Sequence, residues 1–292
     1  MKILILGASG MLGHKLLEVL NKNFEVIGTF RKFHNEIQNY PPFKESQLVF
    51  NVDAMDFSSV KNVISQHKPN VIVNCIGIIK QIKEAKNAIT SIAINSLFPH
   101  QLEEICQSEN IRLIHFSTDC VFSGIQGNYT EQSIPDPEDL YGRSKLLGEL
   151  TGENSLTIRT SIIGRELREY RSLVEWLLNN QDGRVFGYSY AIFSGFPTII
   201  LANIISNVIK NHKDLSGLWH VSSDPISKYD LLVLLNEAFE TNIEISENTS
   251  FHCKRNLNSQ LFRDRINYTP PPWSEMVAEM VADSREYSKL KH

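Results

Sequence analysis

The sequence contains few of the residues that mark metal-binding, disulfide-bonded or membrane-spanning proteins. Its 292 residues include only four cysteines, Cys75, Cys106, Cys120 and Cys253, and none of them form a Cys-x-x-Cys pair. A structural zinc site or a disulfide framework needs clustered cysteines, so we predict no metal and no disulfide. Scattered thiols are typical of a reducing compartment, and we therefore expect a cytoplasmic protein.

Long apolar runs and a surplus of basic residues are also missing. The first apolar run, Ile3 to Leu6, stops at Gly7, which is too short for a signal-peptide core or a membrane span. Lys and Arg number 29 against 33 Asp and Glu, for a net charge of -4. Nucleic-acid binding depends on clustered basic residues, so we expect neither a nucleic-acid nor a membrane partner.

What is present is an alternation of short apolar strands and helical segments. Strands are predicted at 2–6, 25–29, 48–51, 71–75, 111–116 and 156–159, and helices at 11–20, 58–67, 88–106 and 141–150. Further helices are predicted at 172–179, 198–210, 228–239 and from 273 onward, before a charged tail at 283–292 that we expect to be loosely held. Helical crossovers imply parallel strands, so the predicted fold class is α/β, a Rossmann-type doubly wound parallel sheet with a smaller C-terminal α/β substrate domain.

A glycine-rich loop joins the first predicted strand to the first helix. It reads Gly7-Ala8-Ser9-Gly10-Met11-Leu12-Gly13, with G-x-x-G-x-x-G spacing. A pyrophosphate at this place meets unpaired backbone N–H groups and the positive end of the helix dipole. We therefore predict a dinucleotide-binding domain over residues 1–160. Residues 161–292 are predicted to form mainly a substrate-binding region, with some segments returning to the first domain.

The end of the second strand indicates which dinucleotide is bound. An NAD site usually has an acidic residue there, but this sequence has Arg31 and Lys32. Arg31 can bind the 2′-phosphate of NADP and Lys32 can add charge, while a solvated basic loop is the other interpretation. We predict NADP(H), with NAD(H) as the alternative. Asp53, after the third strand, is placed either to accept from the adenine amino group or to cap the next turn.

A tyrosine and a lysine four residues apart at the start of a helix form the candidate catalytic pair. Tyr141 and Lys145 share one helix face, so the ammonium can lower the phenol pKa and hold the cofactor ribose. The spacing alone is not specific, because Tyr40 with Lys44 and Tyr287 with Lys291 match it too. Pro41 and Pro42 argue against a helix carrying the former pair, and the latter lies in the tail.

The fifth strand supplies hydroxyls at the carboxyl edge of the sheet, where open α/β folds bind ligands. Ser117 and Thr118 end that strand. Thr118 can hydrogen-bond a substrate carbonyl while Tyr141 delivers a proton, although each hydroxyl alone could equally bond its own backbone.

Taken in order, these motifs resemble those of the dTDP-4-dehydrorhamnose reductase family. The matching segments are the glycine loop, Asn74, residues 117–122, residues 141–145, Arg159-Thr160-Ser161, residues 217–221 and residues 255–261. The resemblance implies NADPH-dependent reduction of a nucleotide-activated 4-keto-6-deoxy sugar in surface polysaccharide or deoxysugar biosynthesis. It gives Thr118, Tyr141 and Lys145 the catalytic roles.

The resemblance also implies where the ligands lie. Together with the motifs above it predicts cofactor contacts from Gly7, Ser9, Gly10, Met11, Leu12, Gly13, Arg31, Lys32, Asp53, Cys75, Ile76, Gly77, Asn95, Ser117, Tyr141 and Lys145. Predicted substrate contacts are Thr118, Asp119, Val121, Phe122 and Arg255, the last to meet the pyrophosphate unless it forms an ordinary surface pair. Ile162 stands where the family often has Trp, and residues 76–81 replace a more polar segment, so the identity of the sugar stays open.

Two other functions fit the same sequence. One is a nucleotide-sugar epimerase or dehydratase that keeps NAD bound, against which Arg31 argues. The other is a non-catalytic NADP-binding regulatory subunit, against which the intact Thr118, Tyr141 and Lys145 set argues. Besides the nucleotide-sugar substrate we expect a second copy of the chain as partner, in a homodimer. We interpret His14, His100, His115 and His220 as structural.

Overall fold

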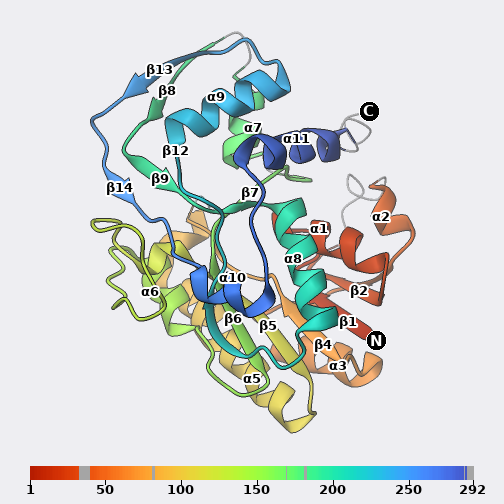
Figure 1. Ribbon diagram of the computed structural model, residues 1–292. Coiled ribbons are helices and arrows are strands. Elements are labelled where there is room, and N and C mark those ends of the chain that lie inside the picture. The colour runs from red at the N-terminus through yellow and green to blue at the C-terminus, as the bar shows by residue number, and fades with distance from the viewer. Residues whose placement is uncertain (33–39, 81–82, 169, 181–182, 286, 288–292) are drawn as a thin grey trace.

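A parallel β-sheet between two layers of helices forms the larger part of the molecule. The computed structural model describes residues 1–32, 40–80, 83–168, 170–180, 183–285 and 287. Over these residues the sheet has seven strands, all paired in parallel (Figure 1). In spatial order they are β11 (Gly217–His220), β6 (Ser155–Thr160), β5 (Arg112–Thr118), β4 (Val71–Asn74), β1 (Lys2–Leu6), β2 (Glu25–Phe30) and β3 (Gln47–Phe50).

Alternating side chains of β1 explain the two helical layers. Ile3 and Ile5 belong to the core that contains α1 (Met11–Asn21) and α8 (Thr198–Asn211), whereas Leu4 and Leu6 belong to the core beneath α3 (Phe57–His67) and α5 (Phe98–Ser108). A strand buried on both faces is a continuous apolar run, as residues Ile3 to Leu6 of β1 are. The doubly wound parallel fold predicted from the sequence is confirmed.

A smaller unit sits above the carboxyl edge of the sheet. Its short strands form three small sheets: β7 (Ile162–Ile163) with β10 (Phe196–Pro197), β12 (Ile226–Ser227) with β9 (Ala191–Phe193) and β14 (Cys253–Lys254), and β13 (Glu244–Asn248) with β8 (Arg184–Tyr188). Its helices are α7 (Leu173–Leu178), α9 (Lys228–Phe239) and α11 (Trp273–Ser284), whereas α10 (Gln260–Ile266) packs against β11 of the large sheet. Because β11 and α8 pack on the large sheet, the chain crosses between the two parts more than once.

The helix predicted at 88–106 is confirmed as a continuous helical stretch over 88–108, with an irregular middle. It consists of α4 (Ala88–Ile92), a π-helical turn (η3, Ala93–Leu97) and α5. Pro99 lacks an N–H and cannot bond the Asn95 carbonyl, so the regular ladder breaks there. That carbonyl lies against Gly148, where an added Cβ would be 1.9 Å from the Asn95 oxygen.

Pro41–Lys44 forms a short helix (α2), because proline is tolerated in a first turn. Tyr40 is its N-cap and lies outside it, so the prediction that no helix carries both Tyr40 and Lys44 is confirmed. The prediction of a loose tail is wrong at Asp283 and Tyr287, whose side chains are buried or nearly so; residues 286 and 288–292 lie outside the described residues. Within the described ranges, the helices are all too short or too polar to cross a bilayer.

Candidate functional site

The glycine loop brings α1 close to β1 and leaves the start of the helix open. Gly7 has φ +82°, and an added Cβ on Gly13 would lie 2.2 Å from the Gly7 carbonyl oxygen. Only glycine fits such close backbone approach. The helix N-cap, Gly10, provides no side-chain cap, so the first N–H groups of α1 can face an anion. These features fit a pyrophosphate in the cradle formed by Ser9 to Gly13.

The residues predicted to select the cofactor lie beside this cradle. Arg31 and Lys32 are exposed directly after β2. Asp53 is half-buried, and its Oδ1 accepts from the Met55 N–H at 2.9 Å. Its turn-capping role is therefore realised, whereas its contact with adenine stays a prediction.

Asn95 ties the loop after β4 to the catalytic helix. Its Oδ1 accepts from the Ile78 N–H at 2.8 Å, and its Nδ2 donates to the Ile78 carbonyl at 3.0 Å and to Ser144 Oγ at 3.1 Å. The buried amide thus fixes the loop that contains Cys75, Ile76 and Gly77 relative to α6 (Leu140–Leu147). Gln81, at the end of the divergent segment, lies outside the described residues.

Thr118, Tyr141 and Lys145 meet at the carboxyl edge of the sheet. Thr118 ends β5, and its side chain interacts with that of Tyr141 at the start of α6. Thr118 Oγ1 donates to Asp119 Oδ1 at 3.1 Å and accepts from the Cys120 N–H at 3.1 Å. Lys145, one turn further, is buried and donates from Nζ to the Phe116 carbonyl at 2.5 Å.

The pKa of Tyr141 is raised, whereas the sequence predicted that Lys145 would lower it. Burial raises it above the usual value, and the electrostatic effects of Cys120 and Asp119 add to the rise, while Thr118 opposes it. Burial lowers the pKa of Lys145 to about 8, against the opposing effect of Glu149 and Cys75. In the ligand-free protein the phenol is therefore a protonated donor, and the ammonium faces a carbonyl.

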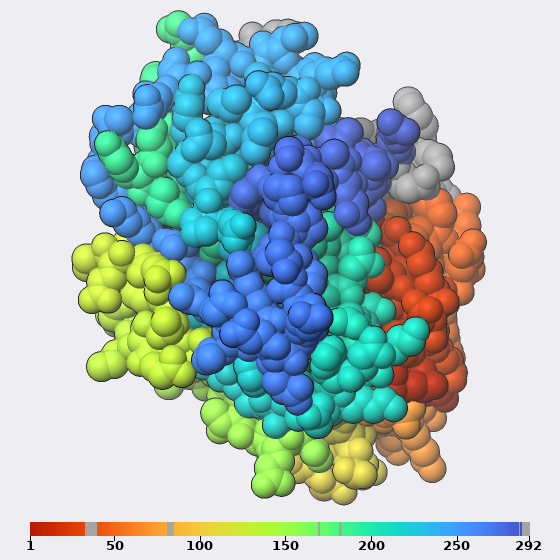
Figure 2. All heavy atoms as spheres, in the orientation of Figure 1, coloured from red at the N-terminus to blue at the C-terminus, as the bar shows by residue number. Residues whose placement is uncertain are grey.

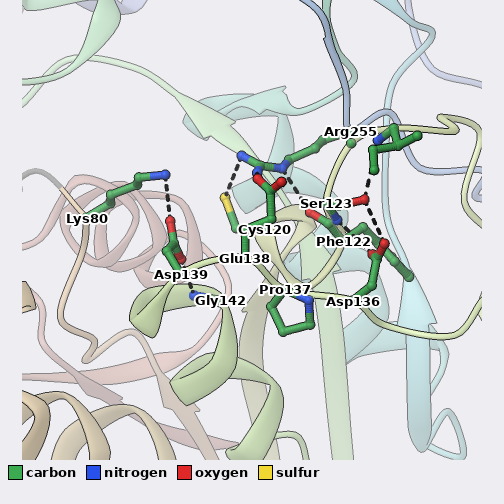
Figure 3. A network of polar contacts seen from close by, with 12 residues as sticks. Lys80, Cys120, Phe122, Ser123, Asp136, Pro137, Glu138, Asp139, Gly142 and Arg255 are labelled. Carbon is green, nitrogen blue, oxygen red and sulfur yellow. Dashed lines mark hydrogen bonds and ion pairs between the residues drawn. The ribbon is translucent and has the colours of Figure 1, made fainter.

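The N-terminus of α6 is held by residues that sequence reasoning missed. Asp139 caps it by accepting from the Gly142 N–H at 2.8 Å, and Lys80 forms an ion pair with Asp139 at 2.6 Å (Figure 3). An added Cβ on Gly142 would lie 2.2 Å from the Cys120 carbonyl oxygen. This close packing aims Tyr141 at Thr118. An acidic residue directly before the helix was the available signal for the cap.

A buried ion pair supports the site from below. Arg159 on β6 binds Glu149 through two contacts of 2.7 Å, and Ser117 Oγ donates to Glu149 Oε1 at 2.7 Å. The Ser117 hydroxyl is thus already engaged, and its cofactor contact stays a prediction. The sequence motif that begins at Arg159 has a structural role in joining β5, β6 and the end of α6.

The burial of Val121 and Phe122 argues against their predicted substrate contacts. Both side chains are 0% exposed, and the Phe122 ring stacks on Tyr129 at 4.2 Å between centroids. Leu257 completes this cluster, which joins the loop after β5 to the segment after β14. In this conformation the two side chains pack beneath the loop and are not exposed on its surface.

Arg255 and Lys228 bring positive charge from the smaller unit to Asp119. Arg255 donates from Nε to the Phe122 carbonyl at 2.9 Å and reaches Glu138 at 3.4 Å (Figure 3). Lys228, which sequence reasoning missed, lies with Nζ 4.0 Å from the centre of the Phe193 ring. Burial raises the pKa of Asp119, and both cations oppose the rise. The arrangement suits a substrate with hydroxyl and phosphate groups.

The comparisons with known proteins agree with this geometry. The family model described as RmlD substrate binding domain matches residues 1–286. A dTDP-4-dehydrorhamnose reductase from Aggregatibacter actinomycetemcomitans is 27% identical over 80% of this chain and 78% of that protein. The methionine adenosyltransferase 2 subunit beta of Xenopus laevis is 31% identical over 94% of this chain and 79% of its own.

Other matches are shorter or more distant. The match to a dTDP-4-keto-6-deoxy-D-glucose reductase from Streptomyces niveus, at 29% identity, spans 50% of this chain and only 45% of that relative. A solved dTDP-4-dehydrorhamnose reductase from Bacillus anthracis in complex with NADP has a TM-score of 0.80 and 21% identity, over 97% of this chain and 99% of that one. This last likeness concerns the fold.

Proposed function

The chain belongs to the RmlD substrate binding domain family, and we propose that it is an NADPH-dependent reductase of a nucleotide-activated 4-keto-6-deoxy sugar. The observation that carries the proposal is the placement of Thr118 next to Tyr141 and of both beside the buried Lys145, above an open glycine cradle. The reductase names of relatives such as the Aggregatibacter protein support the substrate class.

Different residues of the chain would bind different parts of NADPH. Backbone N–H groups of Ser9 to Gly13 would hold the pyrophosphate, and Arg31 with Lys32 would hold the 2′-phosphate. Lys145 would hold the ribose. When bound, NADPH supplies a hydride to the carbonyl carbon of the sugar.

Tyr141 is the proposed proton donor. Its raised pKa keeps the phenol protonated at neutral pH, so it can donate that proton to the carbonyl oxygen as the alcohol forms. Thr118 holds the phenol in place and provides a second hydroxyl near the reacting oxygen. Arg255 and Lys228 are proposed to contact the remainder of the sugar nucleotide.

The test is NADPH oxidation, followed by absorbance, with dTDP-4-keto-6-deoxy sugars in the presence and absence of a 3,5-epimerase. The proposal expects turnover with at least one keto-sugar and a preference for NADPH over NADH. NADPH binding without turnover of any keto-sugar would contradict it.

A second candidate is a regulatory subunit that binds NADP without turnover. It is supported by the 31% identity to the methionine adenosyltransferase 2 subunit beta. Co-purification with a methionine adenosyltransferase catalytic subunit, together with absent keto-sugar turnover, would favour it. The cytoplasmic location is a further proposal, supported by four cysteines that are all free thiols. The homodimer is a prediction that light scattering of the purified protein tests.

A further inference from the structure

The two tyrosines whose Tyr-Lys spacing matched the catalytic pattern by chance lie together in the structure. Tyr40 and Tyr287 are at most 2% exposed, with ring centroids 5.8 Å apart. Lys15 of α1 lies against both, with Nζ 5.9 Å from the Tyr40 ring centre and 5.2 Å from that of Tyr287. Lys291, the partner of Tyr287 in the sequence pattern, lies outside the described residues.

Lys15 links the C-terminal helix, α11, to α1, the helix that follows the glycine loop. Its side chain is fully buried and forms ion pairs with Asp283 of α11 at 2.5 Å and with Glu18 of α1 at 2.6 Å. Figure 1 shows α11 extending from the smaller unit toward the side of α1 and α2, and Figure 2 shows its dark blue surface near the red and orange N-terminal segment. A buried charge needs such pairing, so this attachment is specific.

A chain of hydrogen bonds continues from Tyr287 to the glycine loop. The Tyr287 hydroxyl bonds His14 Nε2, and His14 Nδ1 lies 2.7 Å from the Gly10 carbonyl oxygen. Burial and the nearby Lys15 lower the pKa of His14 to about 3, so the imidazole is neutral and has one N–H. A carbonyl can only accept, so Nδ1 carries that proton and Nε2 accepts from the Tyr287 hydroxyl.

The hydrogen bonds that run from Tyr287 through His14 end at Gly10, which is the N-cap of α1. Its N–H donates to the Gly7 carbonyl at 3.1 Å, and its own carbonyl accepts from both His14 Nδ1 and the His14 N–H. With no side-chain cap at Gly10, these bonds and the packing of the loop determine where the first N–H groups of α1 point. Arg165, 5.2 Å from the Tyr287 ring centre and paired with Glu175 at 2.6 Å, holds the tyrosine from its other side.

We infer that Tyr287 and His14 are positioning residues for the cofactor, through which the C-terminal segment keeps the glycine loop in its dinucleotide-binding geometry. The inference rests on the proposed function only in taking NADPH as the ligand. It predicts that loss of one hydroxyl at residue 287 weakens cofactor binding, although that hydroxyl touches neither cofactor nor substrate.

The test uses the full chain with Tyr287→Phe, which keeps the buried ring and removes only the hydroxyl. NADPH Kd, from NADPH fluorescence without sugar, is expected to rise about three- to tenfold, the range of one lost hydrogen bond. Turnover at saturating NADPH and the KM for keto-sugar should not change. Tyr268→Phe, a partly buried tyrosine after α10, is the matched control and should leave NADPH Kd unaltered.

A double-mutant cycle tests the route through His14. If the relay operates, Tyr287→Phe has little further effect on NADPH Kd in a His14→Gln background. Independent effects of the two changes would overturn the inference. So would a Tyr287→Phe protein with lower Tm and unaltered NADPH Kd, because a purely structural tyrosine gives that result.

Amide hydrogen exchange separates this inference from the proposed function. In the cofactor-free protein, Tyr287→Phe should speed exchange in peptides covering residues 7–15 and leave peptides from α9 unaffected. If the wild type binds no NADPH, the proposed function fails, and exchange still decides whether Tyr287 orders the loop. Unchanged exchange over residues 7–15 would overturn the relay.

Discussion

The side chains of Thr118 and Tyr141 interact with each other, although one ends a strand and the other begins a helix after a long intervening loop. The two are brought together because Asp139 caps that helix and Gly142 packs on the Cys120 backbone. Two hydroxyls are thereby fixed next to each other at the carboxyl edge of the sheet, where a carbonyl oxygen can lie between them and a reduced nicotinamide.

Arg31→Asp should change the preferred cofactor. Replacing a cation next to the 2′-phosphate by an anion is expected to raise NADPH Kd about 10- to 100-fold, with little loss for NADH. Fluorescence titration with both cofactors measures the two constants. Lys210→Asp, an exposed site on α8, serves as the control. Equal weakening of NADPH and NADH would contradict a phosphate contact.

Gly13→Ala should damage the glycine loop more than Gly10→Ala. A Cβ on Gly13 meets the Gly7 carbonyl oxygen at 2.2 Å, whereas one on Gly10 meets it at 3.4 Å. Backbone cannot move as cheaply as a side chain, so Gly13→Ala is expected to cost about 1–3 kcal/mol of unfolding free energy. Urea denaturation measures the unfolding free energy of both variants. Equal values would contradict the close packing of Gly13 on the Gly7 carbonyl.

The pKa of Lys145 predicts a loss of activity in mild alkali. Its folded-state value of about 8 is below the usual value, so the ammonium loses its proton as the pH rises through about 8. Turnover that needs the charged group should decline over that interval, measured as kcat/KM against pH. The stability effect has the opposite sign: burial of the charge costs free energy below the folded pKa, and the cost disappears as pH rises toward the unfolded value. Constant kcat/KM through this interval would contradict the role of the ammonium.

Arg159→Met should destabilise the fold strongly. It leaves Glu149 buried beside Ser117 without its cation, and breaking a buried ion pair in this way costs about 3–5 kcal/mol. The exposed pair of Arg265 and Asp214 gives the control, since Arg265→Ala is expected to cost at most about 1 kcal/mol. Urea denaturation of the two variants measures the difference, and similar losses would contradict the account of the buried pair.

The sequence predicted the parts of the site that depend on local pattern. Apolar runs and helical periodicity identified six of the seven strands of the large sheet, all but β11, and the glycine spacing identified the cradle. The pairing of Thr118 with Tyr141 followed from the rule that ligands bind at the carboxyl ends of parallel strands.

What the sequence could not predict depends on long-range packing. Lys228 and Arg255 approach Asp119 from α9 and from the segment after β14, and no local spacing connects them. The burial of Val121 and Phe122 depends on Tyr129 and Leu257, which are distant in sequence or in a loop. The sequence predicts a loose tail at Tyr287 because its partners, His14 and Lys15, lie at the other end of the chain.

The most direct test of the account is single-turnover reduction of a dTDP-4-keto-6-deoxy sugar by NADPH, comparing the wild type with Tyr141→Phe. Removal of the proton donor is expected to slow reduction about 10²- to 10⁴-fold, while NADPH Kd, measured by fluorescence, stays within about twofold. A Tyr141→Phe protein that reduces the sugar at the wild-type rate would contradict the central claim that Tyr141 protonates the sugar carbonyl.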